Sequence, residues 1–134
     1  MASGHLKRGE LGETAAADYL RRKRYRILDR NWSCRQGELD IVCDLKGTIV
    51  FVEVKTRDSE GMVGPVESLN AKKQERVARA AAQYLSTYQL WDRPCRFDLM
   101  VVLCTGDRVT LEHIINAFDW SETLGRGNAP WQPW

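Results

Sequence analysis

The sequence lacks the features of a membrane-spanning or secreted protein. Its longest largely apolar stretch, residues 48–52, is far shorter than the roughly 18 to 20 residues that a membrane-spanning helix needs. The basic residues near the N-terminus are not followed by the apolar segment of a secretory signal. The cysteines form no C-x-x-C pair, which favours reduced thiols. We therefore expect a cytoplasmic protein that does not bind membranes.

Several common catalytic motifs are also missing. The two histidines, His5 and His113, stand far apart, which argues against a zinc cluster or an H-E-x-x-H metalloprotease helix. The sequence contains no G-x-S-x-G elbow, no P-loop and no G-x-G-x-x-G fingerprint. These absences argue against a serine hydrolase, a P-loop nucleotidase and a dinucleotide-dependent enzyme.

The length and composition are those of one globular domain. The chain has 134 residues, of which 43% are hydrophobic and 28% charged, too few residues for two independent cores. We expect a single domain over residues 1–120 and a C-terminal tail over residues 121–134. The tail ends in Trp131 and Trp134, which could stack on unpaired bases or dock on another chain, although a disordered end is favoured.

Positive charge gathers near the N-terminus. Residues 1–36 contain nine Lys or Arg against four acidic residues, whereas the whole chain has a net charge of only +2. A basic lobe beside an acidic centre suits a protein that grips a polyanion. The alternative is that the run at residues 21–24 only complements the dipole at the end of a helix.

Hydrophobic periodicity predicts alternating helices and strands. Helices are expected over residues 9–23 and 69–88, and strands over residues 25–31, 38–44, 48–57, 96–103 and 108–115, with a glycine-containing loop over residues 57–66. A strand, a long helix and another strand in succession imply a parallel crossover. The predicted fold is α/β, with three layers, an αβββαβ core, a further late strand and a mixed central sheet.

The strand over residues 48–57 is the most unusual element. It is apolar on both faces, which predicts a central position in the sheet, yet it also carries Glu53 and Lys55. In the preceding strand, alternation predicts that Leu39 shares a face with Ile41, and that Asp40 lies on the other face.

The turn between these two strands determines which charged groups meet. A two-residue loop at Lys46 and Gly47 places Asp40 directly opposite Glu53, and a four-residue loop keeps the same register, whereas a three-residue loop would separate the two carboxylates. With an even loop, Asp40, Glu53 and Lys55 project from one face of the sheet.

Two carboxylates so close repel each other by about 4 kcal/mol at an effective dielectric constant near 20. Lys55 supplies one positive charge, but a hard divalent cation satisfies both acids better, and Mg²⁺ (or Mn²⁺) is the natural candidate. A metal ion beside a lysine suits the hydrolysis of a nucleic-acid backbone. The competing interpretation of these three residues is a salt-bridge trio on a solvated sheet face.

These residues resemble a known signature. Asp40 followed by Glu53-Val54-Lys55 is similar to the D…(D/E)-x-K pattern of the PD-(D/E)xK, or restriction-endonuclease-like, nuclease superfamily. Across about residues 9–119 the chain resembles the bacterial YraN family of endonuclease-like proteins. The segments that carry this resemblance are Gly12-Glu13, Asn31, residues 37–41, residues 51–57, Lys73, Arg96-Phe97-Asp98 and Ala117-Phe118.

The resemblance implies a role for each matching residue. Asp40, Glu53 and the main-chain carbonyl of Val54 would hold the metal ion, and Lys55 would act on water. Glu13 would match the helix glutamate that archaeal Holliday-junction resolvases add to the metal site. Lys73 would match a position on the second helix that contacts substrate phosphate.

Plainer interpretations stay open for the outer residues. Glu13 could only complement a helix dipole, and Lys73 could extend past apolar neighbours into solvent. Arg57 is a candidate phosphate contact or an ordinary surface arginine. Helical periodicity places Lys72 and Arg76 pointing away from the buried side of their helix, and Asp98 is expected to be a structural acceptor for Arg96 or a loop amide.

Three functions compete at this point. The first is a Mg²⁺-dependent nuclease acting on DNA, with branched DNA as a candidate substrate and a homodimer as one way to present two sites to two strands. The second is a non-catalytic nucleic-acid-binding module on a nuclease scaffold. The third is a protein-interaction adaptor in which the acidic residues are merely structural.

Overall fold

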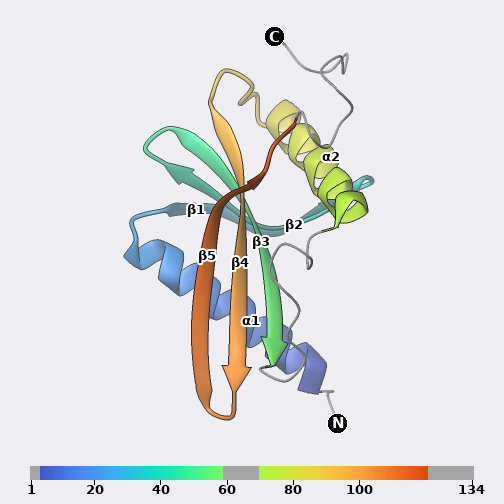
Figure 1. Ribbon diagram of the computed structural model, residues 1–134. Coiled ribbons are helices and arrows are strands. Elements are labelled where there is room, and N and C mark those ends of the chain that lie inside the picture. Colours follow the sequence, from blue (N-terminus) through green and yellow to red (C-terminus); the bar gives the residue numbers. More distant parts are fainter. Residues whose placement is uncertain (1–3, 59–69, 121–134) are drawn as a thin grey trace.

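The computed structural model describes residues 4–58 and 70–120 and confirms the predicted α/β order (Figure 1). Its elements are α1 (Gly4–Arg22), β1 (Arg26–Cys34), β2 (Gly37–Leu45), β3 (Thr48–Asp58), α2 (Ala71–Thr87), β4 (Cys95–Thr105) and β5 (Arg108–Phe118). The predicted tail and most of the predicted loop over residues 57–66 lie outside the described residues. No helix among those described is long and apolar enough to cross a membrane.

The five strands form one mixed sheet in sequence order, so that β3 is central as predicted. β3 and β4 run parallel, and the other neighbouring pairs are antiparallel. The helices α1 and α2 pack on opposite faces of the sheet and complete three layers (Figure 1).

Each face of the sheet has its own hydrophobic core. Under α1, small helix residues meet the aliphatic side chains of the strands; the core there includes Ala16, Ala17, Leu20, Ile41, Val50, Val52 and Met100. Under α2 the core is larger and more aromatic, and it includes Val42, Phe51, Val77, Tyr84, Leu85, Phe97 and Phe118. Because β3 contributes to both cores, its backbone is held from both sides.

The turn between β2 and β3 has the two-residue loop, Lys46 and Gly47, that the sequence predicts. Leu45 pairs with Thr48, and the same register continues as far as Ile41 and Val52. Lys46 and Gly47 both have positive φ angles, of 51° and 98°, as a tight two-residue hairpin of type I′ requires.

The β1–β2 hairpin twists sharply beside Asp40, and here one prediction was wrong. Leu39 packs in the core under α2, whereas Ile41 packs under α1, so they do not share a face. Asn31 of β1, opposite this point, has a φ angle of 52°, which interrupts the regular strand geometry. The alternation therefore breaks at Asp40, between Leu39 and Ile41.

Candidate metal and nucleic-acid site

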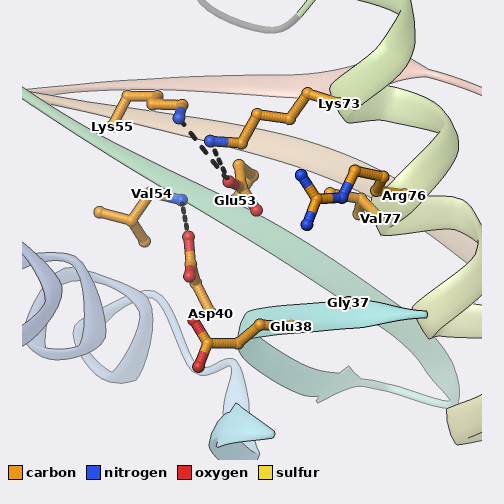
Figure 2. Close-up of a pocket in the computed structure, with 9 residues that line it drawn as sticks. All are labelled: Gly37, Glu38, Asp40, Glu53, Val54, Lys55, Lys73, Arg76 and Val77. Carbon is orange, nitrogen blue, oxygen red and sulfur yellow. Dashed lines mark hydrogen bonds and ion pairs between the residues drawn. The ribbon is translucent and has the colours of Figure 1, made fainter. Parts of the chain in front are cut away.

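One pocket, of about 290 Å³, gathers most of the residues predicted to be functional. It lies between the beginning of β2, the second half of β3 and the first turns of α2 (Figure 2). The residues that line it are Gly37, Glu38, Asp40, Glu53, Val54, Lys55, Lys73, Arg76 and Val77. The predicted set of Asp40, Glu53, Val54, Lys55 and Lys73 therefore converges in space, although it comes from three elements.

Asp40 stands where the pairing of β2 with β3 ends. The last backbone pair joins Ile41 and Val52; beyond it, the Val54 N–H donates a 2.8 Å hydrogen bond to Oδ2 of Asp40 (Figure 2). The carboxylate thus replaces a ladder hydrogen bond at the point where the strands diverge. Because the N–H and C=O of a strand residue point towards the same neighbour, the Val54 carbonyl also faces the side of Asp40.

Glu53 is almost enclosed, with a relative exposure of 7%. Two ammonium groups approach the same carboxylate oxygen: Nζ of Lys73 lies 3.4 Å from Oε2, and Nζ of Lys55 lies 4.0 Å from it (Figure 2). Lys55 reaches it along β3, and Lys73 reaches it from α2. An enclosed carboxylate is tolerated here because positive charge surrounds it.

The environment of the pocket raises the pKa of both acids and lowers that of Lys55. Burial, reinforced by the charge of Glu53, raises the pKa of Asp40 to about 7. Burial also raises the pKa of Glu53, although Lys73 and Lys55 oppose it. Burial and the neighbouring ammonium of Lys73 lower the pKa of Lys55 to about 8.

Two predicted site residues lie outside this pocket. Glu13 of α1 is 3.7 Å from Nη2 of Arg30, an ion pair beside β1, although its charge contributes to the raised pKa of Asp40. Arg57 donates a 3.4 Å hydrogen bond to the carbonyl of its neighbour Thr56. Their predicted roles in metal and phosphate binding stay predictions.

Two further polar residues line the pocket: Glu38, which was expected to serve the turn or face solvent, and Arg76. Arg76 is exposed, as expected for a residue that points away from the buried side of α2, yet its guanidinium extends towards Glu53 (Figure 2). The position of Arg76 beside the pocket could have been predicted from its spacing of three residues from Lys73, since residues three apart lie on the same side of a helix.

A family model described as "Uncharacterised protein family UPF0102" matches residues 12–102 of the chain. The chain belongs to the UPF0102 family. A UPF0102 protein of Nitratidesulfovibrio vulgaris is 50% identical over 126 residues, which cover 94% of each chain. Those of Lawsonia intracellularis and Myxococcus xanthus are 40% and 42% identical, over 94% and 83% of this chain and 96% and 88% of theirs.

The segment that matches the UPF0102 family contains every residue that lines the pocket. The candidate metal donors there are oxygens, namely the carboxylates of Asp40 and Glu53 and the Val54 carbonyl that faces the side of Asp40; Glu38 also lines the pocket. Oxygen donors suit a hard cation such as Mg²⁺, which keeps several of its waters. Among residues 9–58 and 70–120, no three His, Cys, Asp or Glu side chains converge as a set of metal ligands.

Proposed function

We propose that this protein is a metal-dependent nuclease that hydrolyses phosphodiester bonds of DNA. The observation that carries the proposal is the convergence of Asp40, Glu53 and Lys55 in one pocket, in the β2–β3 register that the sequence predicted. The order of elements and the spacing of these residues resemble those of PD-(D/E)xK nucleases and the YraN family.

The residues that would hold a Mg²⁺ or Mn²⁺ ion are Asp40, Glu53 and the carbonyl of Val54. The raised pKa values of both acids support this assignment, because a cation between the buried carboxylate of Glu53 and the half-buried one of Asp40 removes the cost of ionising them. Glu13 is a candidate further ligand from α1. When bound, such an ion polarises a phosphoryl oxygen and increases the acidity of water.

Lys55 is the candidate residue for moving the proton. Its pKa of about 8 leaves part of the population neutral near physiological pH, so its amine can accept a proton from a nucleophilic water. Lys73 is less buried and projects from α2 at the mouth of the pocket, where its ammonium can bind the phosphate that is attacked.

A cleavage screen tests this proposal. Single-stranded, duplex, flap and four-way DNA are incubated with the protein and Mg²⁺ or Mn²⁺. We expect the wild type to cut at least one structure and Lys55→Ala to cut it about 10²-fold to 10⁴-fold more slowly, with DNA affinity within about threefold. Lys72→Ala, a matched exposed lysine on α2 outside the pocket, should cut like the wild type.

Contaminating nucleases are excluded by the same series, because they would cut equally in every preparation. Equal cleavage by wild type, Lys55→Ala and Asp40→Ala would contradict the proposal. A second readout is independent of turnover: titration calorimetry with Mn²⁺ should give binding heat for the wild type and little or none for Asp40→Ala.

A second candidate is a nucleic-acid-binding module that does not cleave. The observation that favours it is the ion pairing of Glu53 with two lysines, which already neutralises that carboxylate. This alternative predicts DNA binding with steep salt dependence, no Mn²⁺ binding heat and no cleavage of any DNA structure.

Branched DNA is the proposed substrate class, and a homodimer would present two pockets to its two strands. Sedimentation of the protein with and without a four-way junction tests this arrangement. We expect two protein chains per junction, whereas one chain per junction would contradict the dimer.

A further inference from the structure

We propose that Arg76 binds a second backbone phosphate of the nucleic acid, next to the phosphate that Lys73 contacts beside Asp40 and Glu53. This inference rests on the proposed function, because it takes the pocket to be the place where the nucleic-acid backbone lies. It assigns Arg76, a residue that was not predicted to belong to the site, to substrate positioning.

The geometry of α2 supports this role. Arg76 follows Lys73 by three residues, so their side chains project from the same side of the helix, with Cβ atoms about 5 to 6 Å apart. Both line the pocket, and Figure 2 shows the guanidinium of Arg76 and the ammonium of Lys73 directed into it from adjacent positions on α2. The two cations can therefore contact two neighbouring anionic groups.

The backbone of α2 is held in place at Arg76. The next residues, Val77 and Ala78, are buried in the core under α2, and Gly37 of the β1–β2 hairpin lies against the main-chain carbonyl of Arg76. The guanidinium consequently projects from an anchored backbone, which lowers the entropic cost of binding a ligand.

The guanidinium of Arg76 makes no hydrogen bond or ion pair with any of residues 9–58 and 70–120, whose side chains the structure describes. Several other arginines of the protein are paired: Arg79 with Glu75, Arg93 with Asp44 and Arg96 with Asp98. The guanidinium of Arg76 therefore projects into the pocket from an anchored backbone, and its N–H donors are unpaired within the described part of the chain. Such a group is suited to bind an external anion.

The chemistry of the guanidinium specifies the class of anion. Its planar fork donates two parallel hydrogen bonds to a phosphate, which an ammonium cannot do. The acids beside it would repel an anion unless a cation neutralised them, so this contact belongs to a complex in which the metal site is filled or the acids are protonated.

The test measures DNA binding without cleavage, at pH 6 in EDTA, by fluorescence anisotropy of a labelled oligonucleotide. We expect Arg76→Ala to weaken binding about tenfold or more and to reduce the slope of log K against log[salt] by about one. Arg79→Ala, one turn further and outside the pocket, is the matched control and should bind within about twofold of the wild type.

Arg76→Lys keeps the positive charge but removes the planar set of donors, so it tests the two contributions separately. It should keep the salt slope of the wild type but recover only part of the affinity, because one point charge replaces two parallel hydrogen bonds. Full recovery by Arg76→Lys would overturn the two-point contact. Thermal melts of all variants identify any loss of binding that comes from unfolding.

Neutral methylphosphonate linkages, introduced one at a time, locate the contact. The wild type should lose affinity at a linkage next to the cleaved one, and Arg76→Ala should be insensitive at that linkage alone. Equal binding by Arg76→Ala and Arg79→Ala would overturn this inference while leaving the nuclease proposal to the cleavage screen. A flatter salt slope for Arg76→Ala in a protein that cuts no DNA would support the phosphate contact and contradict the nuclease.

Discussion

At the scale of single residues, burial makes both Asp40 and Glu53 harder to ionise. Both are withdrawn from water, and the charge of Glu53 adds to the effect of burial on Asp40. Asp40 retains a hydrogen bond from Val54, which favours its ionised form but does not outweigh burial. In the absence of a cation, ionising Asp40 therefore costs folding free energy.

This cost predicts how stability depends on pH. The pKa of Asp40 is about 7 in the folded protein and about 3.8 when unperturbed, so between these values the folded state retains a proton that the unfolded state has released. The free energy of unfolding should therefore fall as pH rises from about 4 to about 7. Asp40→Asn removes this effect and should be more stable than the wild type by roughly 1 to 3 kcal/mol at pH 8, since one pKa unit corresponds to about 1.4 kcal/mol.

Urea unfolding in EDTA at pH 5 and pH 8 checks this prediction. Asparagine can still accept the hydrogen bond from Val54 N–H, so the difference between the two proteins isolates the charge. The stability gain should be roughly halved at pH 5, because less than half of the interval between the two pKa values has then been crossed. Parallel pH profiles for the two proteins would show that Asp40 is not perturbed in this way.

At the scale of elements, the packing of α1 on β3 depends on one glycine. A Cβ atom added at Gly12 would lie 2.0 Å from Oγ1 of Thr56, whereas one added at Gly9 would meet nothing within 4 Å. We expect Gly12→Ala to destabilise the protein by about 1 to 3 kcal/mol, because α1 must move away from the sheet. Gly9→Ala, in the same helix, should stabilise it by about 0.5 to 1 kcal/mol through lower chain entropy.

Chemical denaturation of both glycine variants measures this difference. Thr56→Ala removes the hydroxyl that the new methyl group would strike, so it should restore part of the stability of Gly12→Ala. Equal stability of the two glycine variants would show that α1 does not approach β3 so closely.

The β4–β5 pair is joined through a buried carboxylate. Asp98 is fully buried and accepts hydrogen bonds from Arg96 and from the N–H of Asn116, while Nε2 of His113 lies 2.8 Å from it. This confirms its predicted role as a structural acceptor for Arg96. The pairing of β4 with β5 shifts between Phe97 and Leu99, so the carboxylate satisfies the backbone at the irregularity.

Removing this charge should be costly. Burial alone would raise the pKa of Asp98, but the hydrogen bonds from His113, Arg96 and Asn116 outweigh it and lower the pKa. Its contribution to stability is therefore present above the unfolded pKa and is lost as pH falls through the folded one. We expect Asp98→Asn to lose about 3 kcal/mol or more at pH 7, with a smaller difference from the wild type below pH 4, as measured by urea unfolding.

Local patterns predicted the elements well, and long-range packing explains what they missed. Apolar residues on both faces were sufficient to place β3 at the centre, and the Lys46-Gly47 turn was sufficient to fix its register with β2. The face of Leu39 was wrong because alternation assumes a regular strand, and nothing local signals the twist at Asn31. The direction of Arg76 depends on how α2 crosses the sheet, which periodicity within the helix does not specify.

At the scale of the whole molecule, positive charge occupies two separate regions. The basic run at residues 21–24 is exposed at the end of α1, where Arg21 and Arg22 stand in the last turn and complement the helix dipole. Lys73 and Arg76 belong to the N-terminal half of α2. In Figure 1 these two regions lie on opposite sides of the molecule, so total charge alone could not show which of them serves the pocket.

The separation predicts that the length of the nucleic acid decides which cations matter. An oligonucleotide of about six nucleotides can occupy the pocket without reaching the end of α1, whereas a duplex of about 30 base pairs, near 100 Å long at 3.4 Å per step, can span the protein. We expect the double variant Arg22→Gln/Arg24→Gln to bind the short oligonucleotide like the wild type. For the long duplex, the double variant should lower the salt slope by up to about two and weaken binding severalfold. Lys73→Ala should weaken the binding of both nucleic acids. Anisotropy titrations at 50 to 200 mM salt measure this, and equal losses for both lengths would place the basic run beside the pocket.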